Sequence, residues 1–370
     1  MDVTVVVGGQ FGSEGKGKTT SLLGRDFGEK CAVVRCGGPN SGHITYEHDR
    51  EYCLRLIPSG VVYGSRLFLA PAAVVDLEVL RFEIEKFGVK PILLSVDPFS
   101  VVITPEMKKT EKELTHSISS TGSGTGAATA SKTMRRPETS LVKDILVENQ
   151  WLNPYVQDVK SEIHDLLDNG YRIILEGTQG FALSLHHSRM FPKTTSKDTT
   201  AAQFVMEAGL SPLLVDQVVM VIRTFPVRVF GKQSGPMKNE ITWDLLRQES
   251  GYPYDITELT TVTSKVRRVA RFHMQLVLDS CRVNRPTDLV IHGLDYIDYR
   301  NLGVYRYSEL TTSAKEFLAM VQNDTGVPIR YAFTGKDNKA VVDLEQGLYS
   351  MKIHPDEPLS NYRVSAKLLS

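Results

Sequence analysis

Short apolar runs separated by glycine or polar residues recur along the chain. They are the segments 3–7, 31–34, 66–70, 91–96, 171–176, 218–222 and 288–295. Several are rich in valine and isoleucine and do not alternate with polar residues, which is typical of strands buried on both faces of a sheet. We therefore expect these runs to form the strands of the core.

Between these runs lie segments whose apolar residues fall three and four positions apart, which indicates helices. The clearest are 76–87, which Asp76 can cap, 155–168, and 265–280, which is basic at its beginning. Strands that alternate with helices predict an α/β fold. We expect a single large domain over residues 1–370, built around a mainly parallel central sheet.

The charge balance limits the classes of partner. The 43 Lys and Arg residues equal the 43 Asp and Glu residues, whereas a protein that coats nucleic acid or an anionic membrane needs a positive excess. No apolar run approaches the roughly 18 residues that span a bilayer, and the four cysteines show no CxxC spacing. We expect a cytoplasmic protein that binds small molecules, with neither nucleic acid nor membrane as a partner.

The first apolar run leads into a glycine-rich loop. Residues 12–19, GSEGKGKT, satisfy the phosphate-loop pattern GxxxxGK[ST] between a predicted strand and a predicted helix. Glycines let backbone N–H groups approach phosphate oxygens, and lysine adds a full positive charge. In a generic enzyme of this type Thr19 and a distant aspartate would hold Mg²⁺; Asp97, Asp216 and Asp295 are the candidates that follow apolar runs.

Residues 117–133, SISSTGSGTGAATASKT, contain few apolar side chains. Composition alone favours a flexible linker between domains. The alternative is a substrate loop whose N–H groups and hydroxyls surround an anion.

The run GGQFGSEGKGK at 8–18 resembles the N-terminal signature of adenylosuccinate synthetases, Gly-x-Gln-Trp-Gly-Asp-Glu-Gly-Lys-Gly-Lys. Further motifs similar to that family's follow in the same order. They are GGPNSGH at 37–43, LIPSG at 56–60, STGSGTG at 120–126, EGTQG at 176–180, TTSKDTTA at 194–201, VTSKVRR at 262–268 and FTGKD at 333–337. This resemblance favours a substrate loop over a flexible linker as the interpretation of residues 117–133.

The resemblance implies a ligase that joins L-aspartate to C6 of a purine nucleotide. The nucleotide O6 attacks the γ-phosphate of a nucleoside triphosphate, and the aspartate amino group then displaces phosphate. The implied catalytic residues are Ser13, Lys16, His43 and Gln179: His43 as the acid or donor, Lys16 at the phosphoryl oxygens, Gln179 at the purine O6 and Ser13 at the position of the family's base.

The resemblance also assigns binding residues to each substrate and to Mg²⁺. For the triphosphate they are Gly12, Glu14, Gly15, Gly17, Lys18, Thr19, Asp295, Thr334 and Gly335. For the nucleoside monophosphate they are Asn40, Thr121, Gly122, Gln179, Thr195 and, from the neighbouring subunit of a homodimer, Arg135. For aspartate they are Thr263, Lys265, where the family has arginine, and Arg267; for Mg²⁺ they are Ser13 and the Gly42 carbonyl.

Two departures from the family narrow the expected substrates. Ser13 stands where the family has the aspartate that takes the N1 proton of IMP, and Gly293 replaces the lysine that covers the guanine of GTP. A smaller, neutral residue leaves space for a 2-amino group, so dGMP becomes the expected acceptor and ATP or dATP the donor. This pattern, in a compact chain, resembles the bacteriophage branch of the family that makes a precursor of 2-aminoadenine.

Other functions remain open from the sequence. An ordinary compact synthetase that uses IMP and GTP is the principal alternative. The missing carboxylate at Ser13 also fits a catalytically inactive nucleotide-binding regulator, and the phosphate loop alone fits a kinase.

Overall fold

The computed structural model describes residues 3–47, 50–261 and 263–344. The strands are β1 (Val3–Gly8), β2 (Cys31–Arg35), β3 (His43–Glu47), β4 (Arg50–Leu54), β5 (Arg66–Leu69), β6 (Val74–Val75), β7 (Leu94–Val96), β8 (Val101–Val102), β9 (Arg172–Glu176), β10 (Val215–Arg223), β11 (Val227–Arg228), β12 (Glu240–Ile241), β13 (Arg268–Ala270), β14 (Asp288–His292), β15 (Ile329–Phe333) and β16 (Val341–Asp343). The α-helices are α1 (Lys16–Phe27), α2 (Leu77–Phe87), α3 (Pro105–Lys112), α4 (Thr115–Ile118), α5 (Thr125–Thr133), α6 (Val159–Asp168), α7 (Ala201–Glu207), α8 (Trp243–Ser250), α9 (Met274–Asn284) and α10 (Thr312–Thr325). Val262, in the predicted aspartate motif, and residues 345–370, at the end of the predicted domain, lie outside the described residues.

Nine strands form the central sheet, in the order β16-β15-β14-β10-β1-β9-β2-β5-β7. Every pairing in it is parallel except that of β15 with β16. All seven apolar runs supply strands of this sheet, which confirms the α/β prediction. Among the described residues no helix is long and apolar enough to cross a membrane.

The sheet is covered on both faces, which explains why its strands lack a polar alternation. In β1, Val5 and Val7 pack into one hydrophobic core, whereas Val6 between them packs into a second core on the opposite face. Successive side chains of a strand point to opposite faces, so both sets must be apolar.

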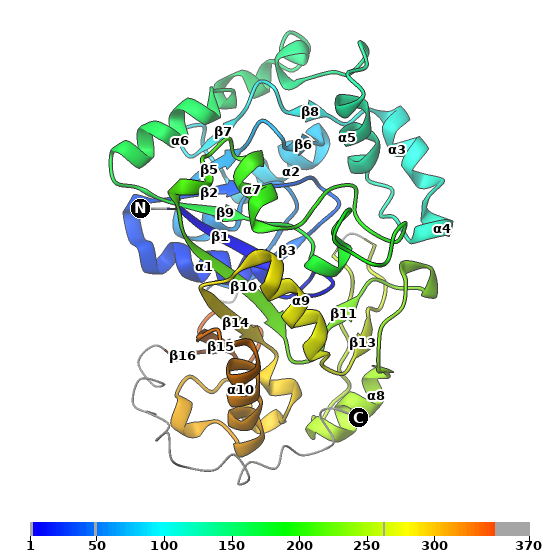
Figure 1. The fold of residues 1–370 in the computed structure, drawn as a ribbon. Helices are drawn as coiled ribbons and strands as arrows, with labels where there is room; N and C mark the ends of the chain where they lie inside the picture. The colour runs from blue at the N-terminus through cyan, green and yellow to red at the C-terminus, as the bar shows by residue number, and fades with distance from the viewer. Residues whose placement is uncertain (1–2, 48–49, 262, 345–370) are drawn as a thin grey trace.

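The parallel strands end at one edge of the sheet, where the functional loops begin. The phosphate loop follows β1, the 36–42 segment follows β2, and the 177–180 turn follows β9. Helices α3 to α5 and the small sheet β11-β13-β12 with α8 lie beyond this edge (Figure 1). Ligands of open α/β sheets bind outside the carboxyl ends of the strands, so this edge is where a site is expected.

Two predicted helices differ from the structure. The 155–168 helix begins only at Val159, and the basic start of 265–280 is strand β13, followed by helix α9 from Met274. Arg268 in β13 pairs with Glu240 of the adjacent β12 at 2.6 Å, and this cross-strand pair suits a sheet better than a helix. Arg271, which follows β13, pairs with Glu249 at 2.7 Å.

The 117–133 segment is only partly a loop. Residues from Thr125 form α5, which Gly124 starts with a φ of 84°. The loop proper is 119–124, preceded by α4. The alanines of residues 125–133 suit a short helix, which packs through Ala128.

Helix α2 matches its prediction and also supports the site. The Asp76 carboxylate accepts hydrogen bonds from the backbone N–H groups of Glu78 and Val79, as expected of an N-cap. Further along, the buried Glu83 carboxylate accepts bonds from the N–H groups of residues 55, 56 and 57, at 2.6, 3.0 and 2.9 Å. Glu83 therefore fixes the turn that carries the 56–60 motif.

We expect Glu83→Ala to lower the free energy of unfolding by about 3 kcal/mol, because three buried N–H groups lose a charged acceptor. Urea denaturation of the full chain measures this loss. Glu85→Ala, on the same helix with a side chain 66% exposed, is the control and should cost about 0.5 kcal/mol at most. Equal losses for the two variants would contradict the role given to Glu83.

Candidate functional site

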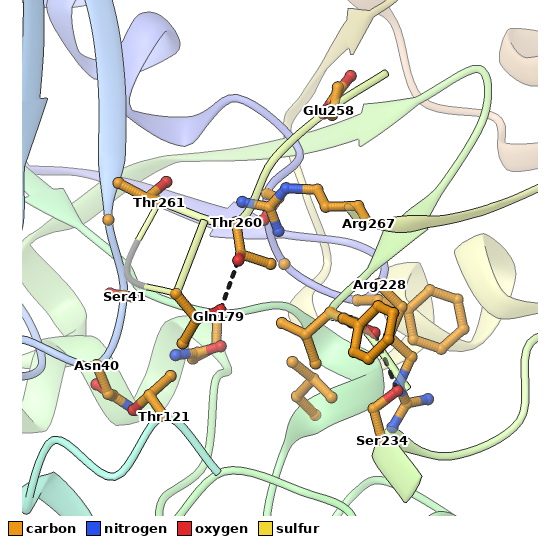
Figure 2. A pocket seen from close by; sticks show the side chains of 18 of the residues that line it. Asn40, Ser41, Thr121, Gln179, Arg228, Ser234, Glu258, Thr260, Thr261 and Arg267 are labelled. Carbon is orange, nitrogen blue, oxygen red and sulfur yellow. Dashed lines mark hydrogen bonds between the residues drawn. The ribbon is translucent and has the colours of Figure 1, made fainter. Parts of the chain in front are cut away.

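A large cleft of about 1080 Å³ opens at the carboxyl edge of the sheet. The lining comes from the phosphate loop, residues 40–44 and 118–121, Gln179, residues 191–196, 257–261 and 263–265, Arg267, residues 292–293 and residues 295–296. Figure 2 shows labelled side chains from several of these segments directed into the same space. Most of the residues predicted from motifs are thus brought together.

The phosphate loop is shaped from within by Glu14. Its buried carboxylate accepts hydrogen bonds from the N–H groups of Gln10 (3.1 Å) and Gly12 (2.8 Å) and pairs with Lys16 Nζ at 2.7 Å. The loop needs the left-handed region at Gly12 and Gly15, whose φ angles are 86° and 107°. The Glu14 carboxylate is consequently occupied by the loop itself, so only its backbone remains for a triphosphate.

Lys18 connects the phosphate loop to the predicted C-terminal loop. Its Nζ donates to the backbone carbonyls of Gly335 (2.7 Å) and Asp337 (3.2 Å) and lies 4.2 Å from the centre of the Phe333 ring. Burial lowers the pKa of Lys18 to about 7, against the opposing effect of Asp295. With two carbonyl partners, Lys18 positions the 333–337 segment as well as carrying charge into the cleft.

Thr19 and Thr334 do not line the cleft. The Thr19 hydroxyl is fully buried and lies 3.2 Å from His292 Nε2, and the Thr334 hydroxyl donates to the Val304 carbonyl at 2.6 Å. The Mg²⁺ arrangement of a generic phosphate-loop enzyme is therefore not formed. Of its three candidate aspartates, only Asp295 reaches the cleft.

His43 is held by a buried carboxylate. Its Nδ1 lies 2.5 Å from Glu176 Oε1 at the end of β9, and Arg35, at the end of β2, contacts both side chains. Burial, together with the positive charge of Arg35, lowers the pKa of His43 to about 4. Burial alone would raise the pKa of Glu176, but His43, Arg35 and the Ser59 hydroxyl lower it to about 2.

A pKa of about 4 makes the His43 imidazole neutral near neutral pH. The Nδ1 side of the ring contacts Glu176 and Arg35, and His43 also lines the cleft. Negative phosphoryl groups in the cleft would raise the pKa of His43 and so favour its protonated form.

Gly293 and Asp295, which follow β14, also line the cleft. Gly293 has a φ of 87°, and a Cβ there would lie 2.9 Å from Thr224 Oγ1, so the family's lysine does not fit this backbone. Asp295 is 7% exposed, and the Tyr252 hydroxyl donates to its carboxylate. Burial raises the pKa of Asp295.

The residues predicted for the nucleoside monophosphate are mostly gathered in one part of the cleft. Asn40, Thr121, Gln179 and Thr195 line it, whereas Gly122 and Arg135 do not. Gln179 occupies the left-handed region, with a φ of 61°, on the turn packed against the phosphate loop. Such a strained non-glycine residue is frequent at functional sites.

The residues predicted for aspartate line the cleft on the 257–267 segment. The Thr263 hydroxyl lies 2.6 Å from that of Thr260, and Arg267 Nε donates to the Leu259 carbonyl at 3.1 Å. This segment packs on the 40–43 turn so closely that a Cβ on Gly42 would lie 2.3 Å from the Thr261 side chain. The positive end of Arg267 faces the cleft beside Thr260 (Figure 2).

The chemistry of the donors fits a Mg²⁺ ion that arrives with a nucleotide. Among the described residues no group of three or more His, Cys, Asp or Glu side chains could hold a metal by itself. Nucleotide-bound Mg²⁺ keeps mainly phosphate and water oxygens as ligands. Gly42 and Ser13, both on the cleft wall, can add one or two protein oxygens to such a set.

Sequence reasoning missed the ion pair between Arg223 and Glu258. The Glu258 carboxylate accepts from both terminal nitrogens of Arg223, which also donates to the Ser13 carbonyl at 3.1 Å, and Tyr296 donates to Glu258 at 2.9 Å. Arg223 ends the buried run of β10 at the functional edge. A charged residue at the end of an otherwise apolar run was a signal from which the sequence could have identified Arg223 as a site residue.

Comparison with known proteins gives the family. A family model described as adenylosuccinate synthetase matches residues 5–151 and 138–302. The chain belongs to the adenylosuccinate synthetase family. It is a carbon–nitrogen ligase of this type, which joins aspartate to a purine nucleotide.

Relatives and solved structures agree with this membership. The chain is 36% identical to the adenylosuccinate synthetase of Methanocaldococcus jannaschii over 94% of this chain and 98% of that protein, and 35% identical to that of a Pyrococcus species over 93% and 98%. The fully ligated Plasmodium falciparum adenylosuccinate synthetase has the same fold, with a TM-score of 0.80 at 19% identity, covering 93% of this chain and 100% of that chain. The cyanophage S-2L succinoaminodeoxyadenylate synthetase, bound to dGMP and dATP, matches with a TM-score of 0.79 at 25% identity, covering 94% and 98%.

The low pKa of His43 predicts a pH-dependent stability. Between its ordinary value of 6.5 and about 4, the unfolded chain binds a proton that the folded chain does not. The contribution of His43 is therefore complete above pH 6.5 and falls, by up to about 1.4 kcal/mol per pH unit, as the pH drops towards 4. We expect His43→Asn to weaken this dependence in urea denaturation between these two pH values.

The pKa of Glu176 falls from its ordinary value of 4.5 to about 2 in the folded chain, so its own contribution changes mainly below about pH 5, and the comparison is made above that pH. The control is His187→Asn, which removes an exposed histidine and should leave the dependence of the wild type unchanged. A His43→Asn protein with the wild-type slope would show that the buried imidazole is not the titrating group.

Proposed function

We propose that this ligase joins L-aspartate to C6 of dGMP with hydrolysis of ATP or dATP, giving N6-succino-2-amino-2′-deoxyadenylate by way of a 6-phosphoryl intermediate. The observation that carries the proposal is Ser13. Its side chain is exposed to the cleft, at the position where the family signature has an aspartate. A hydroxymethyl group leaves space beside N1 and C2 of the purine, where dGMP carries its 2-amino group.

The part of the cleft that would bind the base of the nucleoside triphosphate supports the same proposal. Gly293, in place of the family's lysine, provides no side chain to cover a guanine base, and the Tyr252 hydroxyl already occupies part of the Asp295 carboxylate. The cyanophage enzyme bound to dGMP and dATP shows that a protein of this fold accommodates that pair of nucleotides.

The proposal assigns residues to the phosphoryl transfer, after which the aspartate amino group displaces phosphate from C6. Gln179 holds the purine O6 as it attacks the γ-phosphorus, Lys16 and the loop N–H groups neutralise the phosphoryl oxygens, and ADP leaves. His43, supported by Glu176, donates to the developing charge after its pKa has risen beside the phosphates. Mg²⁺ supplies charge neutralisation for the triphosphate when it is bound.

The proposal also covers the two smaller ligand groups. The 5′-phosphate lies at Asn40, Thr121 and Thr195, and the aspartate carboxylates lie at the 263–267 segment, where Lys265 acts as a point charge. Arg135 is exposed, with a φ of 54°, and does not line the cleft of its own chain. This position suits the proposed homodimer in which Arg135 of one subunit serves the site of the other.

A second candidate function is that of an ordinary adenylosuccinate synthetase acting on IMP with GTP. The curated relatives favour it more directly, because they carry that name and are 36% and 35% identical to this chain, against 25% for the phage enzyme. Ser13 and Gly293 are the residues that favour the first candidate. The substrate is therefore best decided by assay.

A product assay pairs dGMP, GMP and IMP with ATP, dATP and GTP in the presence of aspartate and Mg²⁺. We expect aspartate-dependent ADP or dADP release and a succino-nucleotide detected by mass spectrometry with dGMP, and little with IMP. Turnover of IMP far above that of dGMP would replace the first candidate with the second. Absence of any succino-nucleotide would contradict both.

We expect Ser13→Asp to lower kcat/KM for dGMP at least about tenfold more than for IMP, because the carboxylate fills the space beside the 2-amino group. The measurement is steady-state kinetics with both nucleotides. Ser13→Asn is the matched control for size without charge, and it should show the same selective loss. Equal effects of Ser13→Asp on both substrates would exclude the steric argument.

A further inference from the structure

The exposed aromatic ring of Phe230 faces the cleft and has no role in the reaction described above. Its side chain is 54% exposed, and it lines the same cleft as the predicted substrate residues. A large apolar side chain exposed inside a ligand cleft commonly marks a binding surface.

The loop that carries Phe230 is fixed on both sides of the ring. The Ser234 hydroxyl lies 2.8 Å from the Gly231 carbonyl oxygen and 3.2 Å from that of Val229, and Arg268 donates to the same hydroxyl at 3.0 Å. The backbone therefore presents the ring in a defined position, although solvent reaches the ring itself.

Phe230 lies between the segments to which the proposed function assigns phosphate and aspartate. On one side, a Cβ on Gly231 would lie 3.5 Å from Ser119 Oγ, at the start of the 119–124 loop. On the other side, Lys265 Nζ lies 5.4 Å from the centre of the Phe230 ring. In a nucleotide the sugar joins the phosphate to the base. With the phosphate at the 119–124 loop and the base at Gln179, the sugar must lie between them, and Phe230 lies beside that position.

We propose that Phe230 is a specificity-determining residue that faces the sugar of the acceptor nucleotide and favours 2′-deoxyribose over ribose. This inference rests on the proposed position of the acceptor in the cleft. A phenyl ring offers no hydrogen-bond partner, so a 2′-hydroxyl placed against it loses its water without compensation. The methylene of deoxyribose has no such loss and gains apolar contact.

The test compares deoxyribose with ribose, once in guanine nucleotides and once in hypoxanthine nucleotides. The kcat/KM of the full-length enzyme is measured for dGMP, GMP, dIMP and IMP with ATP and aspartate, and dissociation constants of the same four nucleotides are measured by calorimetry. We expect the wild type to prefer the deoxynucleotide of each pair about tenfold or more. In Phe230→Ser the preference should fall about tenfold, mainly through better use and tighter binding of the ribonucleotide.

Two further variants control for folding and for loss of an exposed aromatic ring. Phe230→Leu keeps an apolar side chain and should retain most of the deoxyribose preference. Phe82→Ala removes a ring that is 60% exposed on α2 and does not line the cleft, and it should leave the preference at its wild-type value.

Ribonucleotides used or bound as well as their deoxy counterparts by the wild type would overturn the inference. A preference that is unchanged in a folded Phe230→Ser protein would overturn it as well. A preference for hypoxanthine over guanine would contradict the proposed acceptor base but not the sugar selection, because the dIMP and IMP pair measures the latter independently.

Discussion

The active-site cleft depends on one buried carboxylate, that of Glu176. It accepts hydrogen bonds from the N–H (2.9 Å) and hydroxyl of Ser59, contacts His43 Nδ1 at 2.5 Å and lies 3.5 Å from Arg35. Four separate segments of the chain are thus held together beneath the cleft. Removal of one partner from such a buried charged network leaves the others unsatisfied, which costs several kcal/mol, so the four segments must form together.

The strand positions and most of the site were predictable from the sequence because their causes are local. Uninterrupted valine and isoleucine runs predicted the strands, and Asp76 identified the start of α2. The motifs follow the carboxyl ends of those strands, so the residues predicted from them meet at one edge once the sheet forms. The family resemblance supplied the ligand assigned to each residue, which strand patterns alone do not give.

The errors came from interactions between distant segments. The 265–280 segment has an apolar spacing compatible with a helix, yet Arg268 pairs with Glu240 and the backbone joins a sheet. The pairs Arg223–Glu258 and Tyr252–Asp295 join residues 35 and 43 positions apart. Arg223 is marked by its place at the end of a buried run, but no local pattern marks its partner Glu258 or the Tyr252–Asp295 pair. These contacts decide which charged side chains in the cleft already have partners.

The contact between Lys18 and the 335–337 segment has an evolutionary consequence. Both acceptors are backbone carbonyls, which every amino acid provides. Side chains in that segment can therefore be exchanged while the segment stays anchored to the phosphate loop. Enzymes with different nucleotide preferences can descend from one scaffold by point substitution, because the framework that carries the phosphates does not depend on the residues that read the base.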